Sequence, residues 1–245
     1  MSGEYAASFR SVSKRFGSTT AVDDITFDVR PGRITGLLGR NGAGKTTSLK
    51  MLLGLARPTE GTTTVFGRPY ASLPDAAHRV GVGMDGVNSI PDMRGRRELR
   101  VWSRMLGLPD RRVDEVLELV GLGDRAERRV KDYSTGMRQR HTIAGALLAD
   151  PEFLVLDEPV NGLDPDGIRW LRGFLRRLAD EGRTVLISSH LLAEVEQTVD
   201  DVVVIQKSLR YSGPLSGLVS GPDERLEERF FSLVGSENEK EKVSA

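Results

Sequence analysis

The residues with the most recognisable chemistry occupy positions 39–46, which read GRNGAGKT and match the pattern G-x-x-x-x-G-K-[ST]. Its glycines allow successive backbone N–H groups to converge on one anion, and the positive end of the following helix points there too. Lys45 adds a charge, and Thr46 adds a hydroxyl for Mg²⁺. A glycine-rich turn with a chance Lys-Thr pair is the alternative. The full match in a strand-to-helix context favours a phosphate-binding loop, named the glycine loop below.

Two carboxylates, Asp157 and Glu158, follow the apolar run at 153–156. Open parallel sheets bind ligands at the carboxyl ends of their strands. Asp157 fits the acidic group that would hold Mg²⁺ beside Thr46, and Glu158 could orient, or accept a proton from, the water that attacks the γ-phosphate. A pair of carboxylates in an ordinary turn is the alternative. The glycine loop in the same chain favours the catalytic interpretation.

Short apolar runs and alternation predict the strands that position these groups. The run at 34–38 leads into the glycine loop, and apolar residues at 49, 52, 53 and 56 predict a helix after it. Alternation at 25–29 predicts a peripheral antiparallel strand before it, and further strands are expected at 62–66, 80–82, 153–156, 184–188 and 201–205.

Helical spacing dominates residues 94–149, and helices are also expected near 168–178, 192–199 and 226–233. Strands that alternate with helices indicate a parallel sheet. We therefore expect an α/β fold: a P-loop NTPase core with a mainly parallel sheet, an N-terminal antiparallel β part and an inserted α-helical subdomain. The expected segments are 1–84 (first part of the core), 85–150 (helical subdomain), 151–220 (second part of the core) and 221–245 (C-terminal helix and charged tail).

Composition narrows the class of protein. Lys plus Arg and Asp plus Glu both number 35 among 245 residues, so a broad electrostatic argument for a nucleic-acid partner is lacking. The chain has no cysteine, which excludes disulfides and thiolate metal sites and fits a reducing cytosol. We expect neither a signal peptide nor a membrane span. Residues 94–112 hold seven arginines against Glu98 and Asp110, a pattern that is usually a solvated face.

A second motif occupies positions 133–140, which read YSTGMRQR. Ser134 and the N–H of Gly136, at the start of a helix, would form either a second anion site or a simple serine cap. The stretch resembles the signature of ATP-binding cassette (ABC) ATPases, Leu-Ser-Gly-Gly-Gln followed by Gln-Arg, and Ser134 precedes Asp157 by 157 − 134 = 23 positions, as in that family. The resemblance extends over residues 5–234.

The resemblance implies that ATP lies between the glycine loop of one copy and the signature of a second copy or a homologous subunit. Glu158 and the switch histidine, His190, would be catalytic. Phe16 would stack on adenine, although an exposed Phe at a strand end is the alternative. Residues 161–164 match a loop that crosses the dimer interface, although Gly and Asp are also common in turns. The implied ATP-binding residues are Phe16, Gly39, Asn41, Gly42, Ala43, Gly44, Lys45, Thr46, Thr47, Ser134, Gly136 and Asp164.

The sequence departs from the family pattern at several positions. Asp85 stands where the family has a Gln that binds Mg²⁺; our hypothesis is that Asp85 is a third Mg²⁺ ligand with Thr46 and Asp157, and protonation or an outward orientation are the alternatives. Arg40 replaces a Pro and could lie along the phosphates or in solvent. Thr135 and Met137 are milder changes within the signature.

By resemblance, the chain is an ATP-hydrolysing subunit of an ABC transporter, of the bacterial type that exports drugs, antibiotics or lipid-like compounds. It would act with Mg²⁺ as a head-to-tail dimer on the cytoplasmic face of the membrane, docked through its arginine-rich insert to an integral membrane subunit, with anionic headgroups as a second possibility for the insert. No nucleic acid is expected. Relatives that act on ribosomes or DNA commonly carry tandem cassettes or basic extensions, and a small-molecule kinase would not be expected to carry the signature.

Overall fold

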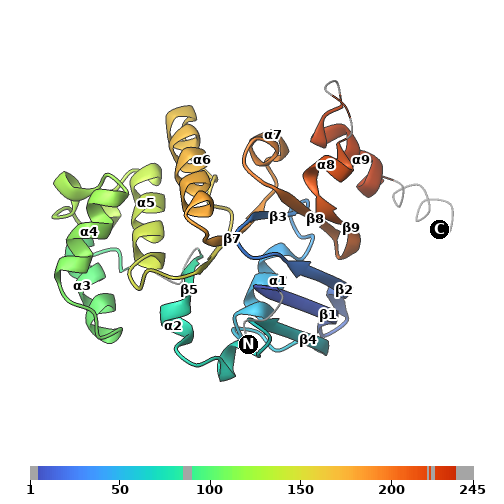
Figure 1. Ribbon diagram of the computed structural model, residues 1–245, viewed down its shortest axis with the longest axis horizontal. Coiled ribbons are helices and arrows are strands. Elements are labelled where there is room, and N and C mark those ends of the chain that lie inside the picture. The colour runs from blue at the N-terminus through green and yellow to red at the C-terminus, as the bar shows by residue number, and fades with distance from the viewer. Residues whose placement is uncertain (1–4, 85–89, 220, 222–223, 236–245) are drawn as a thin grey trace. The chain divides into compact units, whose positions relative to one another are not determined.

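The computed structural model describes residues 5–84, 90–219, 221 and 224–235. The chain forms two compact units (Figure 1). Unit 1 comprises Met1–Leu73 and Ile187–Ala245, and unit 2 comprises Pro74–Leu186. Among the described residues, none of the helices combines the length and the apolarity needed to cross a bilayer.

Unit 1 contains an antiparallel sheet in the order β2-β1-β4. Its strands are β1 (Ala7–Phe16), β2 (Thr19–Val29) and β4 (Glu60–Val65). The alternation in β2 buries Ile25, Phe27 and Val29, and Phe27 stacks on Phe9 of β1 with 4.2 Å between ring centroids. The prediction of an antiparallel strand before the glycine loop is therefore confirmed.

The strand that carries the glycine loop, β3 (Ile34–Leu38), is fully buried and pairs in parallel with β8 (Asp201–Gln206). Strand β9 (Ser208–Pro214) runs antiparallel to β8. Buried Val and Ile residues of β8 supply the apolar run expected of a strand covered on both faces. Strand β7 (Thr184–Ser189) runs across the boundary between the units. The helices of unit 1 are η1 (Tyr70–Ser72), α1 (Lys45–Leu52), α7 (Leu192–Glu196), α8 (Leu215–Leu218) and α9 (Leu226–Gly235).

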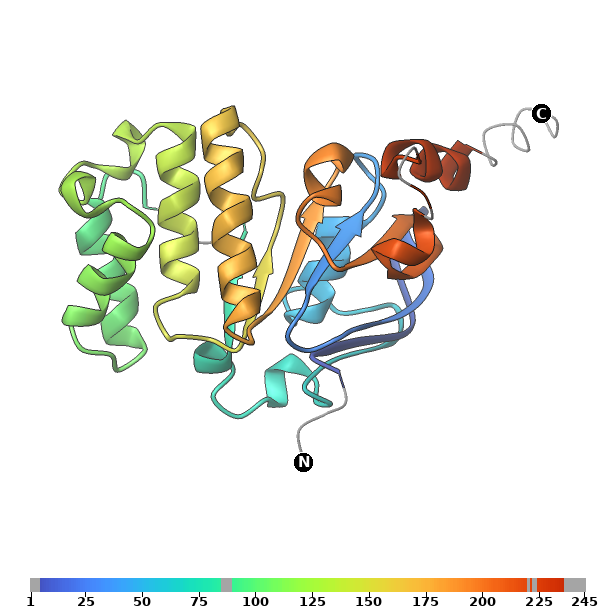
Figure 2. The same ribbon diagram turned by 45° about the horizontal axis from the view of Figure 1, so that its top comes forward.

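Unit 2 joins two parallel strands to the predicted helical insert. Strands β5 (Val80–Gly83) and β6 (Phe153–Leu156) pair from Val80↔Phe153 to Gly83↔Leu156. Helices α5 and α6 run side by side, with α3 and α4 beyond α5 (Figure 2). The helices are α2 (Ala76–Arg79), α3 (Gly95–Met105), α4 (Arg111–Leu119), η2 (Gly123–Arg125), η3 (Val130–Asp132), α5 (Thr135–Ala146) and α6 (Pro165–Asp180).

The α/β class, with mainly parallel strands and a separate antiparallel sheet, is confirmed. Local details differ from the sequence-based expectation. Strands β1 and β9 were not expected, α1 ends at Leu52 before Ala56, and α9 buries Val234 more deeply than Leu233. The predicted segment boundaries at 84/85, 150/151 and 220/221 remain a prediction. The two compact units meet at other places in the chain, between Leu73 and Pro74 and between Leu186 and Ile187.

Candidate functional site

The glycine loop lies in unit 1 between the end of β3 and the start of α1. Gly42 and Gly44 have φ angles of 80° and 101°, which side chains rarely adopt. A Cβ atom on Gly44 would lie 2.6 Å from the Ala21 carbonyl oxygen, and one on Gly39 would lie 2.5 Å from the Ile205 carbonyl oxygen. The loop is therefore pressed against β2 and β8, and its backbone path requires glycine at both ends.

Lys45 is nearly buried and folds back over this loop. Its Nζ donates hydrogen bonds to the carbonyl oxygens of Gly39 at 2.7 Å and Arg40 at 3.3 Å. No side chain caps the start of α1, so an anion can take the place of a capping group there. The ammonium group, the positive helix end and Thr46 in the first helical turn are thus collected at one place, as a phosphate group requires.

Phe16 and His190 are the other predicted site residues of unit 1. Phe16 is the last residue of β1 and is 56% exposed, with Lys14 Nζ 4.9 Å from its ring centroid. Its exposed ring is compatible both with adenine stacking and with an exposed strand end. His190 directly follows β7, where the Leu191 N–H donates to Ser189 Oγ at 3.0 Å and turns the chain. The roles of both residues remain predictions.

Asp157 and Glu158 follow β6 in unit 2, and the chain turns between them. The Asp157 N–H donates to the Gly83 carbonyl at 2.8 Å, which extends the pairing of β6 with β5 by one residue. Glu158 has a φ of 48°, a left-handed conformation that costs a non-glycine residue about 1 kcal/mol or more. The two carboxylates therefore do not alternate as in a regular strand, and strain of this kind is concentrated at functional sites.

The signature begins α5, also in unit 2. Ser134 caps this helix, and its Oγ accepts a hydrogen bond from the Met137 N–H at 3.2 Å. The expected serine cap is therefore present. It leaves the hydroxyl hydrogen available to donate, so the cap and an anion-binding role are compatible. The anion-binding role of Ser134 and Gly136 stays a prediction.

The loop at 161–164 meets the signature. Asp164 caps α6 by accepting a hydrogen bond from the Gly167 N–H at 2.8 Å. A Cβ atom on Gly162 would lie 2.8 Å from Thr135 Cγ2, and one on Gly136 would lie 3.7 Å from Leu163 Cδ2. Two motifs whose contacting residues are 162 − 135 = 27 positions apart in sequence are thus neighbours at the starts of adjacent helices, as a shared interface would require.

The metal ligands are only partly described. Thr46 lies in the first turn of α1 and Asp157 follows β6, whereas Asp85 lies outside the described residues. Within those residues no group of three or more His, Cys, Asp or Glu side chains is placed to hold a metal. A hydroxyl beside a phosphate cradle and a strand-end carboxylate are nonetheless oxygen donors of the type that Mg²⁺ uses together with phosphate oxygens.

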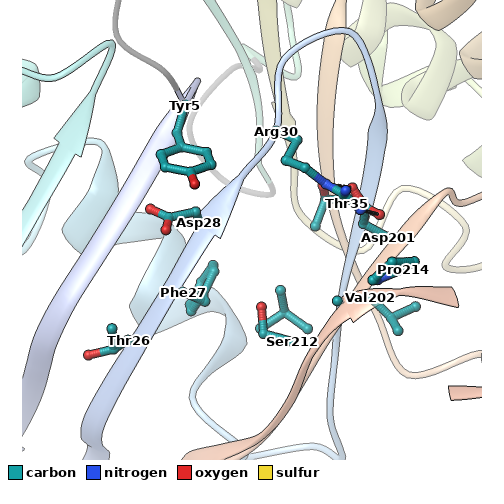
Figure 3. A pocket seen from close by; sticks show the side chains of 12 residues that line it. Tyr5, Thr26, Phe27, Asp28, Arg30, Thr35, Asp201, Val202, Ser212 and Pro214 are labelled. Carbon is teal, nitrogen blue, oxygen red and sulfur yellow. Dashed lines mark hydrogen bonds and ion pairs between the residues drawn. The ribbon is translucent and has the colours of Figure 1, made fainter. Parts of the chain in front are cut away.

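A cavity of about 310 Å³ in unit 1 is separate from the glycine loop (Figure 3). Arg30 and Asp201 lie together at one end of it, and Arg30 and Arg33 both bind Asp201, Arg33 at 2.8 and 2.9 Å. Burial favours a higher pKa for Asp201, but the hydrogen bonds and charges of Arg33 and Arg30 outweigh it and lower the pKa. These charged groups satisfy one another, so we assign them to the stability of unit 1.

Comparison with known proteins identifies the family and the fold. The ABC transporter family model matches residues 22–161. The bacitracin transport ATP-binding protein BcrA of Enterococcus faecalis is 42% identical over 207 residues, which are 83% of this chain and 67% of that protein. The Nod factor export ATP-binding protein I of Burkholderia orbicola is 43% identical over 204 residues, 81% of this chain and 67% of that protein. A solved ATP-binding subunit of an ABC transporter superposes with a TM-score of 0.82 at 26% identity, covering 94% of this chain and 99% of that one.

Proposed function

The chain belongs to the ABC transporter family of ATPases, and we propose that it is the ATP-hydrolysing subunit of a membrane exporter. The observation that carries this proposal is that one chain holds two different helix starts suited to an anion, the glycine loop before α1, which has no side-chain cap, and Ser134 at the start of α5. The cargo proposed is a drug, an antibiotic or a lipid-like compound, because the similar proteins are named for bacitracin transport and Nod factor export.

Unit 1 supplies the cradle for the phosphates. On ATP binding, the Lys45 ammonium exchanges its contacts with the Gly39 and Arg40 carbonyls for phosphate oxygens, and the loop N–H groups complete the cradle. Thr46 and Asp157 are the proposed ligands of Mg²⁺, which when bound neutralises phosphate charge. Phe16 would stack on the adenine ring.

Hydrolysis is assigned to Glu158 and His190. Glu158 would hold the attacking water and draw on its proton, while His190 would contact the γ-phosphate and fix the water. Asp85 is proposed as a third Mg²⁺ ligand. Unchanged Mg²⁺ dependence and an unchanged ATPase rate in Asp85→Ala would end that part of the proposal.

The second copy supplies the other half of each site. Ser134 and Gly136 of α5 would contact the γ-phosphate held by the partner, and the loop ending at Asp164 would cross the interface beside them. The same patch on both copies would form a closed two-fold dimer. ATP would favour the closed state, and hydrolysis would remove the bridging phosphate and let the dimer open.

We propose that the arginine-rich insert docks to a membrane subunit at the cytoplasmic face. The structure reduces the number of arginines available for this contact, as follows from their ion pairs. Arg96 is 22% exposed and pairs with Asp114 and Glu127, so its charge is already in use. Acidic partners are likewise present for Arg94, Arg100, Arg104 and Arg112. Arg97 and Arg111 are exposed, and within the described part of the chain neither forms an ion pair.

Arg97→Glu combined with Arg111→Glu should therefore weaken stimulation of ATPase activity by the membrane subunit more than it lowers basal ATPase activity. Arg68→Glu, an exposed charge reversal in unit 1, is the control. Equal losses of stimulated and basal activity would count against docking at this face.

The proposed function is tested by measuring Mg²⁺-dependent ATP hydrolysis, ATP-driven dimerisation and co-purification with a hydrophobic membrane protein. We expect Glu158→Gln to bind ATP, to accumulate as a closed dimer and to hydrolyse ATP at least about 100-fold more slowly. Phosphate transfer to a metabolite would instead indicate a kinase, and hydrolysis stimulated by nucleic acid would indicate the ribosome- or DNA-acting class.

A further inference from the structure

Unit 2 contains a buried carboxyl group for which the proposed reaction has no use. The side chain of Glu98, in the first turn of α3, is 0% exposed. Its Oε1 accepts a hydrogen bond from the Ile90 N–H at 2.8 Å. Its Oε2 is also buried and has no hydrogen-bond partner among the described residues. The sequence suggested only a charge in an arginine-rich run, and burying such a group needs an explanation.

Glu98 lies against the helix that carries the signature. His141 of α5 is 2% exposed, and its Nε2 is 3.9 Å from Glu98 Oε2. The same nitrogen is 3.2 Å from the Gly95 carbonyl oxygen at the start of α3. Because a carbonyl only accepts, Nε2 carries the hydrogen. Tyr133, the residue before Ser134, packs edge-on against His141 with 5.7 Å between ring centroids.

The start of α3 packs tightly against Tyr133 and His141. A Cβ atom on Gly95 would lie 2.2 Å from the Tyr133 hydroxyl oxygen and 3.2 Å from His141 Cδ2. Glycine at this position lets α3 approach Tyr133 and α5 closely. The start of α3 and the start of α5 are therefore in direct contact through Gly95.

Residues 90–94, which lead into α3, are named the linking segment. They are hydrogen-bonded to the residues that precede the signature. The Lys131 N–H donates to the Pro91 carbonyl at 2.8 Å, and the Val130 N–H donates to the Met93 carbonyl at 2.9 Å. Residues 128–133 lead directly into Ser134. Glu98 thus holds one end of the linking segment through Ile90, while backbone bonds join the rest of it to the approach to the signature.

The surroundings of Glu98 favour its uncharged form. Burial raises the pKa of Glu98, although the hydrogen bond from the Ile90 N–H and the nearby polar N–H of the Trp102 side chain act in the opposite direction. Burial lowers the pKa of His141, and its bond to the Gly95 carbonyl opposes that shift. A neutral acid beside a neutral imidazole avoids two poorly solvated charges. The other ionisable groups near the cluster are Tyr133, Arg96, Glu127 and Arg128.

We propose that Glu98 is a positioning residue for ATP hydrolysis: with His141 it joins the linking segment and the start of α5 into one body and so fixes where Ser134 is presented. The inference rests on the proposed function, in which Ser134 completes the partner's ATP site. The inference makes one specific prediction. The contact of Glu98 with Ile90 and α5 requires the shape and the hydrogen bond of the Glu98 side chain and does not require its negative charge.

The test compares Glu98→Gln, Glu98→Ala and Ser103→Ala with the wild-type chain. Glutamine keeps an oxygen for the Ile90 N–H and carries no charge. Ser103 is a matched control, because it is also buried on α3 but bonds to the carbonyls of Leu108 and Pro109 and not to α5. The measurements are exchange of the Ile90 amide, ATP binding by the monomer, kcat and KM for ATP, and ATP-driven dimerisation in the Glu158→Gln background.

We expect Glu98→Ala to raise the exchange rate of the Ile90 amide about 10-fold and to lower kcat about 10-fold, because roughly one hydrogen bond is lost. The affinity of the monomer for ATP should change less than about twofold. Glu98→Gln should retain at least half of the wild-type kcat and should still dimerise. Ser103→Ala should lose stability without a selective loss of kcat.

Wild-type kcat and dimerisation in Glu98→Ala would overturn the positioning role. A Glu98→Gln variant that loses most of the wild-type kcat and no longer dimerises would overturn the uncharged form, and because its reference is the wild-type chain, this comparison holds even if Glu98→Ala fails to fold. A wild-type chain that binds ATP but neither dimerises nor hydrolyses it would overturn the proposed function, and the inference with it.

Discussion

The helices proposed to face phosphate in the two units begin in different ways. Helix α1 in unit 1 follows Gly44, has no side-chain cap and has the Lys45 ammonium folded over the preceding loop. Helix α5 in unit 2 is capped by its own Ser134. The first start is incomplete without an anion, whereas the second already satisfies one of its N–H groups. We infer that unit 1 binds nucleotide by itself and that unit 2 adds a weaker contact that matters only when the dimer closes.

The buried carboxyl groups of the two units, Asp201 and Glu98, differ in the charge of their neighbours. Asp201 in unit 1 is surrounded by Arg30 and Arg33, which supply opposite charge. Glu98 in unit 2 has a backbone N–H donor and a buried histidine as neighbours, and burial raises the pKa of Glu98 and lowers that of His141. Opposite charges thus surround the buried carboxylate of unit 1, whereas burial disfavours charge on the one in unit 2.

The largest effect is expected from Lys45→Ala, which removes the ammonium from the glycine loop. Hydrolysis should fall at least about 100-fold and ATP-driven dimerisation should be lost, because a charge-assisted contact to phosphate disappears. Steady-state kinetics and equilibrium binding of ATP measure this. Lys50→Ala, on the exposed end of the same helix, is the control and should behave as wild type. Full ATP binding by Lys45→Ala would remove the distinction between the two helix starts.

The glycine loop can be tested with a matched pair of substitutions. Gly42 and Gly44 both have positive φ, but an added Cβ meets nothing within 4 Å at Gly42 and lies 2.6 Å from the Ala21 oxygen at Gly44. Gly42→Ala should cost about 1 kcal/mol of stability through strain, and Gly44→Ala about 2 kcal/mol more together with loss of ATP binding. Urea denaturation and ATP titration measure both. Equal costs would show that the loop is not held against β2.

The signature should respond through the dimer. Ser134→Ala should lower the free energy of unfolding by about 1 kcal/mol, because the cap of α5 is lost, and should slow hydrolysis about 10-fold while ATP binding by the monomer is unchanged. Ser134→Asp separates the two roles: aspartate caps the helix but repels phosphate, so stability should be retained and dimerisation lost. Full-rate hydrolysis by a monomer with Ser134 altered would contradict the half-site account.

The smallest effects, on the order of 1 kcal/mol, should appear in the pH dependence of stability. Folding lowers the pKa of the Asp201 carboxyl group. The ionised carboxylate therefore stabilises the folded chain at pH values above the pKa of the unfolded chain, and this stabilisation is lost as the pH falls through the pKa of the folded chain. The cost of Asp201→Asn should therefore shrink in acid. Folding raises the pKa of the Glu98 carboxyl group. The protonated group therefore stabilises the folded chain at pH values below the pKa of the unfolded chain, and this stabilisation is lost as the pH rises through the pKa of the folded chain.

Glu98→Gln should accordingly gain stability relative to wild type as pH rises, the opposite trend to Asp201→Asn. Urea denaturation from about pH 4 to pH 8 compares the two variants. Parallel pH trends for both would contradict the contrast between the buried carboxylates.

The sequence by itself determined much of the fold and of the site. Short apolar runs identified β3, β5, β6, β7 and β8 within one or two residues, because a strand buried on both faces needs side chains of that kind throughout. The glycine loop could be recognised because its backbone path admits only glycine at Gly39 and Gly44. Two strands carry a weaker signal: the edge strand β9 reads SLRYSGP, and β1, although central in its sheet, is interrupted by irregular pairing, so neither range was predicted.

Other properties were decided by the tertiary structure. Arg96 and Arg97 are adjacent in sequence and equally charged, yet only Arg96 meets acidic partners, which α4 and the 126–130 segment bring to it. Glu98 reads as one more surface charge until folding places His141 of α5, 43 positions later, beside it. Sequence patterns report what each residue is and which face of its own element it occupies. The charge that a buried group carries depends on neighbours from distant segments, and only the folded chain supplies them.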